Sequence, residues 1–198
     1  MNNPKQGKLY WHDAHFEVLK LELINYENDL TFEQEHMLSQ EALRMDTLII
    51  KKNKDIKIEK NIGRIFKAHN IIEYKSEKDS FTQWDYNKLL GYALIYSSFE
   101  KVNLSNITIS ISLTKHPKKL VESLKAKGLK ITQPDQGIHQ IQGELIPIQI
   151  LESKKLSEEE NIFLHSLRSN IGAKKVYKSI SAYEKHRPLN KNNAYLDI

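Results

Sequence analysis

Residues 106–113, NITISISL, carry the pattern that most limits the folds open to this chain. Isoleucine or leucine alternates there with threonine or serine. This alternation predicts a strand with one buried face, because successive strand side chains point to opposite faces. Apolar residues at helical spacing precede the strand, at 12–25 and from residue 79 onward, and a further helix is expected after it at 117–127. A buried strand between amphipathic helices predicts an α/β sandwich.

The other segments extend this pattern. Further strands are expected at 30–38, 44–51, 68–76, 137–141 and 146–151. Further helices are expected at 117–127, 157–169 and 173–185, and the helix after residue 79 has Asp79 and Ser80 as candidate caps. Early strands in a hairpin followed by strands that alternate with helices indicate a central mixed sheet flanked by helices. Residues 1–170 are expected to form one domain, and residues 171–198 a basic C-terminal helix with a frayed tail.

Composition excludes several classes of protein. The 198 residues include no cysteine, which excludes disulfide scaffolds, iron–sulfur clusters, thiol catalysis and Cys-ligated zinc. No run approaches the roughly 18 apolar residues of a membrane helix, and the first residues lack the apolar stretch of a secretory signal. We therefore expect a cytoplasmic protein with no membrane partner.

Basic charge is concentrated in two segments. Residues 115–130 and 174–191 each hold six Lys or Arg against one acid, in a chain of net charge +5. Such density favours polyanions, because each neutralised phosphate releases condensed counterions, although a solvated lysine-rich surface has the same composition. The candidate phosphate contacts are Lys118, Lys119, Lys174, Lys175 and Lys178.

Three ionisable residues fall in or beside predicted buried strands. Asp46 precedes the apolar run TLII, while Glu73 and Lys75 stand in NIIEYKS and share a strand face, about 6.6 Å apart. Asp46, Glu73 and the backbone carbonyl of Tyr74 would supply three oxygen ligands to Mg²⁺ or Mn²⁺. Lys75 would then hold or deprotonate a metal-bound water. Alternatively, Lys75 forms a buried salt bridge with Asp46 and the cluster is purely structural.

Asp46, followed by Glu73-Tyr74-Lys75 on the next core strand and then by a helix, resembles the PD-(D/E)XK nuclease superfamily. Residues 21–52 and 62–96 are similar to a group of uncharacterised bacterial proteins in that superfamily, described as nuclease-like or transposase-associated. The resemblance covers residues 10–115 best. Met45 departs from the proline of the motif name, and Asn87 stands where some members carry a tyrosine four residues after Gln83.

The resemblance implies a restriction-endonuclease-like sandwich and a Mg²⁺-dependent nuclease that hydrolyses phosphodiester bonds in DNA. It assigns metal binding to Asp46 and Glu73, the catalytic lysine to Lys75, and an auxiliary acid on the first helix to Glu22, with Glu17 as its rival. The alternative is a catalytically silent binding module that acts through nucleic acid or a protein partner in a mobile-element or defence system. The sequence leaves a homodimer open and does not separate DNA from RNA.

Four aromatic or imidazole side chains are expected to take no part in metal binding or in contacts with nucleic-acid bases. His12 and His15 stand three apart on the first predicted helix and are expected to be solvated rather than to bind a metal. We expect Trp11 and Trp84 to pack as core or helix anchors rather than as platforms for nucleic-acid bases.

Overall fold

The chain forms a mixed sheet in the computed structural model, which describes residues 11–34, 47–168, 171–187 and 195–196. The described strands are β1 Leu30–Glu33, β2 Leu48–Lys52, β3 His69–Lys75, β4 Ile107–Leu113, β5 Lys130–Asp135, β6 Ile138–Gln142 and β7 Ile148–Glu152. They form one seven-stranded sheet in the order β1-β2-β3-β4-β7-β6-β5. The β3–β4 and β4–β7 pairs are parallel and the other neighbouring pairs are antiparallel.

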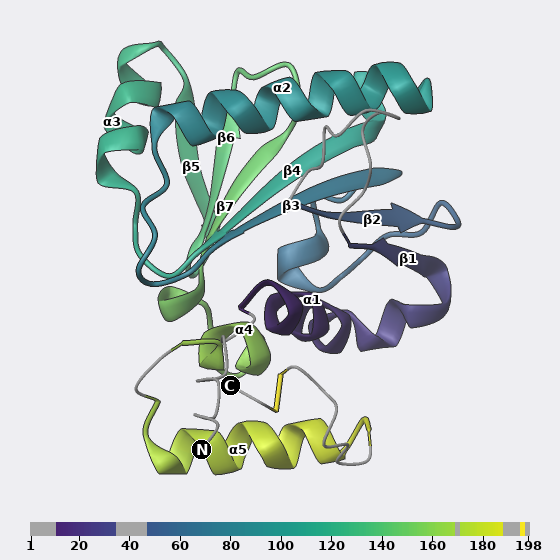
Figure 1. Ribbon diagram of the computed structural model, residues 1–198, viewed down its shortest axis with the longest axis vertical. Helices are drawn as coiled ribbons and strands as arrows, with labels where there is room; N and C mark the ends of the chain where they lie inside the picture. Colours follow the sequence, from purple (N-terminus) through teal and green to yellow (C-terminus); the bar gives the residue numbers. More distant parts are fainter. Residues whose placement is uncertain (1–10, 35–46, 169–170, 188–194, 197–198) are drawn as a thin grey trace, which may run out of the picture.

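Helices cover both faces of this sheet (Figure 1). The described α-helices are α1 Trp11–Glu22, α2 Gln83–Glu100, α3 Lys118–Ala126, α4 Ile162–Ser166 and α5 Ala173–Glu184. Helices α2 and α3 lie on one face, α1 and α4 lie on the other, and α5 packs outside α4 (Figure 1). Two hydrophobic clusters fill the two interfaces. The expected α/β sandwich with C-terminal helices is confirmed, and its layers are consistent with a restriction-endonuclease-like fold.

Strand β4 differs from its prediction, because all seven of its residues are buried. The alternation predicted one solvated face, but α1 and α4 cover that side as well. Two of its three polar residues are hydrogen-bonded internally: the Thr108 hydroxyl donates to Asn70 Oδ1 at 2.6 Å, and Gln149 Nε2 donates to Ser110 Oγ at 2.8 Å. The Ser112 hydroxyl is buried without a hydrogen-bond partner among the described residues. Buried polar groups are tolerated when they are hydrogen-bonded, so a central strand can keep an alternating sequence.

Helix α2 starts later than its candidate caps Asp79 and Ser80 suggested. Its N-cap is Thr82, whose hydroxyl accepts a hydrogen bond from the backbone N–H of Asp85, while the Asp85 carboxylate accepts one from the Thr82 N–H. This reciprocal capping box satisfies two N–H groups that the first turn leaves without helical partners.

Two aromatic or imidazole residues also differ from expectation. Trp11 packs against the core as expected, but Trp84 is 79% exposed. His15 is buried instead of solvated and stacks on Tyr74 with a ring separation of 4.4 Å. The expectations failed because spacing along a helix does not reveal which face of that helix meets the sheet.

The C-terminal segment packs on the domain where the structure describes it. Tyr183 of α5 is 1% exposed, and Tyr195 stacks on it with ring centroids 6.3 Å apart. The frayed tail is therefore not seen at Tyr195 and Leu196, which contact the core. Within the described ranges, none of the helices combines the length and apolar character that crossing a membrane requires.

Candidate functional site

Three parallel strands end together at one edge of the sheet. Lys75 of β3 is in register with Leu113 of β4, and Leu113 is in register with Glu152 of β7. These three residues form one row on the face that α2 and α3 cover, with neighbouring strands about 4.8 Å apart. In α/β sheets, ligands commonly bind just beyond the carboxyl ends of the parallel strands, so a ligand site is expected at this edge.

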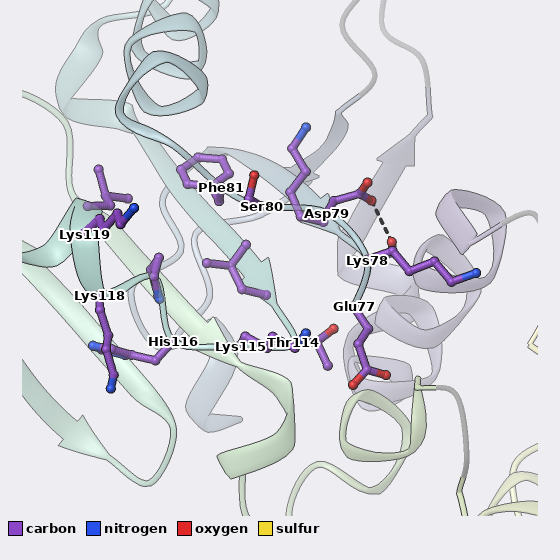
Figure 2. A pocket seen from close by; sticks show the side chains of 15 residues that line it. Glu77, Lys78, Asp79, Ser80, Phe81, Thr114, Lys115, His116, Lys118 and Lys119 are labelled. Atoms are coloured by element: carbon purple, nitrogen blue, oxygen red, sulfur yellow. Dashed lines mark hydrogen bonds between the residues drawn. The ribbon is translucent and has the colours of Figure 1, made fainter.

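A cavity of about 410 Å³ opens at this edge, between the β3–α2 and β4–α3 loops (Figure 2). We call it the basic cavity because five lysines line it: Lys75, Lys78, Lys115, Lys118 and Lys119. Its acidic lining residues are Glu77 and Asp79. Glu77 pairs with Lys154, and Asp79 accepts a hydrogen bond from Ser76 at 2.6 Å. Two predicted phosphate contacts, Lys118 and Lys119, thus belong to a concave positive surface.

A smaller pocket of about 100 Å³ adjoins Lys75 from the α2 side. We call it the carboxylate pocket; its lining residues are His12, Glu73, Lys75, Asp85, Lys88, Leu89 and Tyr92. The Lys75 ammonium lies 3.5 Å from Glu73 Oε1 and 3.6 Å from Asp85 Oδ1. Lys75 lines both cavities, so it connects a pair of acids with the basic surface.

Asp85 is the acid that the sequence did not indicate. Partial burial alone would raise the pKa of its carboxyl, but the hydrogen bonds from Thr82 and the charge of Lys75 hold that pKa below its usual value. The capping box fixes the carboxylate where helix α2 begins. Asp85 therefore stays ionised beside Lys75 at neutral pH.

The other predicted site residues have different surroundings. Asp46 lies outside the described residues. The Tyr74 ring stacks on His15 on the opposite side of the sheet, so only the Tyr74 backbone can contribute to the pocket. Where the structure describes it, the pairing of β2 with β3 ends at Leu48 and Ile72. No described residue of β2 is therefore paired with Glu73.

Glu22 lines neither cavity. It is buried at the start of α4, where its Oε1 accepts hydrogen bonds from the backbone N–H groups of Phe163 at 2.8 Å and Leu164 at 3.0 Å. Its Oε2 lies 2.6 Å from the Lys60 ammonium. Burial raises the pKa of Glu22, and Lys60 opposes that shift. These contacts give Glu22 a structural position at a helix terminus, away from the residues that flank Lys75.

The predicted phosphate contacts on α5 are partly neutralised. Lys175 and Lys178 lie 3.0 and 2.8 Å from the two oxygens of Glu158. Hydrogen bonds from these lysines lower the pKa of Glu158 to about 2. Lys174 is exposed. The α5 surface thus offers less uncompensated positive charge than its sequence suggests.

A third group of side chains was missed by the sequence analysis. His116 follows β4, His139 belongs to β6 and Glu152 ends β7, and their ligand atoms all lie within 4.8 Å of one another. We call this group the histidine cluster, and it could hold a metal ion. No spacing in the sequence signals it, because the cluster forms only when β7 pairs with β4 on one side and with β6 on the other.

Comparison with known proteins gives no relative from which to transfer a function. No protein-family model, curated protein or solved structure matches this chain.

Proposed function

We propose that this protein is a divalent-metal-dependent nuclease that hydrolyses phosphodiester bonds in DNA at the junction of the two cavities. The observation that carries the proposal is the position of Lys75, which lines both the carboxylate pocket and the basic cavity. A phosphodiester held by the lysines of the basic cavity would reach the carboxylate pocket beside this ammonium. The residue pattern that resembles the PD-(D/E)XK superfamily supports the same assignment.

The carboxylate pocket is suited to a hard divalent cation. Two carboxylates, Glu73 and Asp85, already flank a positive charge there, and Mg²⁺ and Mn²⁺ prefer oxygen ligands. Glu73 would hold the ion together with Asp46 and the backbone carbonyl of Tyr74, as the sequence predicts. The bound ion would lower the pKa of a coordinated water and polarise the phosphate.

The residues of the chain have separable tasks in this reaction. The Lys75 ammonium orients the attacking water or stabilises negative charge that develops on the phosphate. Asp85 holds Lys75 in position from α2. Lys118 and Lys119 bind the flanking phosphates and carry no sequence information. Cleavage would thus depend on the metal and on Lys75, whereas binding would depend mainly on the basic cavity.

Cleavage assays with matched variants test this proposal. Wild-type protein is incubated with plasmid DNA, single-stranded DNA or RNA, with Mg²⁺ or Mn²⁺ and with a chelator. We expect chelation, Glu73→Gln and Lys75→Met each to lower the cleavage rate by about 100-fold or more. The controls Glu184→Gln and Lys57→Met change exposed residues that line neither cavity and should cleave normally. Cleavage that survives Glu73→Gln and Lys75→Met contradicts the proposal.

One observation favours a second candidate, a nuclease-fold module that binds nucleic acid without cleaving it. Asp85 is already engaged by Thr82 in the capping box, and both acids contact Lys75, so the pocket is also stable as an ion-pair network. Under this alternative, DNA binds in the basic cavity with metal-independent affinity and Glu73→Gln has no effect on it. Metal-dependent cleavage would exclude this candidate.

A further inference from the structure

We propose that the histidine cluster binds one transition-metal ion of the Zn²⁺ class and leaves one coordination position open to an oxyanion in the basic cavity. The site is distinct from the carboxylate pocket and does not depend on the proposed nuclease activity. Its ligands would be His116 Nδ1, His139 Nε2 and Glu152 Oε1.

The three ligand atoms already converge. His116 Nδ1 and His139 Nε2 both contact the same oxygen, Glu152 Oε1. The distance from His139 Nε2 to this oxygen is 2.5 Å. His139 Nε2 is buried and lies within ion-pair distance of this oxygen without making a hydrogen bond. A tetrahedral ion with bonds of about 2.1 Å holds its ligand atoms about 3.4 Å apart. Movements of about 1 Å would therefore admit the ion.

The surroundings orient the carboxylate for this role. Glu152 is 1% exposed, and Lys155 Nζ lies 2.8 Å from its second oxygen, Oε2. Outer partners of this kind fix the orientation of metal ligands. Because Lys155 contacts Oε2, the other oxygen, Oε1, is the one that would bind the ion.

The donor set selects the class of metal. Two imidazole nitrogens and one carboxylate oxygen suit Zn²⁺, Fe²⁺ or Ni²⁺, whereas Mg²⁺ prefers oxygen alone. Within the described ranges, the ligand group has these three members. Three protein ligands are typical of zinc sites that keep a position for water or substrate, because structural sites are usually closed by four.

The open position is directed to the basic cavity by the location of His116. His116 lines that cavity together with Lys115 and Lys118 (Figure 2). Glu152 stands in the same row of the sheet as Lys75, two strands away, which is about 10 Å between backbones. An oxyanion held by the cavity lysines can therefore complete the coordination of the ion. Phosphate is the simplest ligand of this chemistry.

Titration of Zn²⁺ alone into metal-free protein tests the site. We expect one Zn²⁺ per chain, with affinity weakened more than about 100-fold in His139→Gln and His116→Asn, since loss of even an outer partner costs roughly 10–100-fold. The matched control is His186→Asn, an exposed histidine on the C-terminal side of α5. Glu73→Gln should bind Zn²⁺ as the wild type does.

A surface variant tests the site independently, in case the variants of the buried ligands fail to fold. Lys155 is 60% exposed, so Lys155→Met should keep the circular dichroism spectrum of the wild type and still lower Zn²⁺ affinity by roughly 10–100-fold. Unchanged affinity in Lys155→Met and in the folded histidine variants would overturn the site, as would an equal loss in His186→Asn.

Co²⁺ in place of Zn²⁺ tests the open position. Inorganic phosphate added to the Co²⁺-loaded protein should change its visible absorption spectrum, because a new oxygen ligand alters the coordination of the ion. The phosphate concentration that gives half of this change should rise in the Lys118→Ala/Lys119→Ala double variant. A spectrum that phosphate leaves unchanged would show a closed site and overturn this part of the proposal.

Discussion

Trp84 has the largest exposed fraction of the exposed large hydrophobic side chains among the described residues. It is 79% exposed and lies two residues after the N-cap of α2. Its neighbours Ser80 and Phe81 line the basic cavity (Figure 2). Exposed aromatic rings beside lysines are the usual platform on which proteins stack the bases of single-stranded nucleic acid. Under the proposed function, Trp84 is a candidate platform of this kind.

We expect Trp84→Ala to weaken single-stranded DNA binding by about 1–3 kcal/mol, the usual contribution of one stacked base. The free energy of unfolding should change by less than about 0.5 kcal/mol, because the ring is exposed. Fluorescence anisotropy and urea unfolding measure the two quantities. Phe99→Ala is the control, since Phe99 is 59% exposed at the other end of α2. Equal weakening by both variants would rule out a specific stacking role.

His15 makes stability depend on pH. Burial lowers its pKa from 6.5 to about 3, and its Nε2 is buried without a hydrogen-bond partner. Between these values the unfolded chain binds more protons than the folded chain, so stability is fully present above pH 6.5 and falls as the pH is lowered towards 3. From pH 7 to pH 5 this group should remove about 2 kcal/mol from the free energy of unfolding.

The variant His15→Phe keeps a ring against Tyr74 and removes the titration. We expect its free energy of unfolding to decline less between pH 7 and pH 5 than that of the wild type, by about 2 kcal/mol. Urea unfolding at the two pH values measures the difference. His12→Phe is the control, because His12 is exposed. A wild-type pH profile in His15→Phe would mean that other groups dominate the acid response.

At the scale of elements, the α2 capping box makes a prediction of its own. Thr82→Ala removes the hydroxyl that accepts from the Asp85 N–H, so the free energy of unfolding should fall by about 1 kcal/mol. Ser98→Ala, an exposed change within α2, should alter it by less than about 0.5 kcal/mol. Urea unfolding measures both. An unaffected Thr82→Ala would indicate that packing of α2 against the sheet, and not its cap, determines the start of the helix.

The sequence predicted most elements but not their surroundings. Strands β3 and β4 were recognised because β-branched residues or strict alternation mark them. Strand β5 was missed because Pro134 and polar residues interrupt its pattern, and α4 is shorter than its apolar spacing suggested. Burial on both sides of β4 depends on helices far away in the chain, which no local pattern records.

The candidate site was predictable to the extent that its residues are close in sequence. Glu73 and Lys75 share a strand face, so their spacing alone brings them together. Asp85 joins them only because α2 crosses back over β3, and the histidine cluster depends on the register of β4, β6 and β7. Contacts set by tertiary pairing leave no periodic signal in the sequence, so these residues could be found only in the structure.

At the scale of the whole molecule, the two basic segments differ in the charge they leave available. Lys118 and Lys119 line the basic cavity (Figure 2). By contrast, Lys175 and Lys178 share the carboxylate of Glu158, and an ion-paired lysine must break that pair before it can neutralise a phosphate. By composition alone, both segments are equally good candidates for phosphate contacts. Because the α5 lysines are already ion-paired, we expect phosphates to bind at the basic cavity instead.

The salt dependence of DNA binding distinguishes the two surfaces. Each phosphate contact contributes about 0.9 to the slope of log affinity against log salt, so Lys118→Ala/Lys119→Ala should reduce the slope by about 2 if both lysines bind phosphates. Lys175→Ala/Lys178→Ala should leave the slope within about 0.5 of the wild type. Anisotropy titrations from low to moderate salt measure both. A larger loss in the α5 double variant would mean that DNA displaces Glu158 and binds along α5, which would move the bound strand away from Lys75 and weaken the case for cleavage.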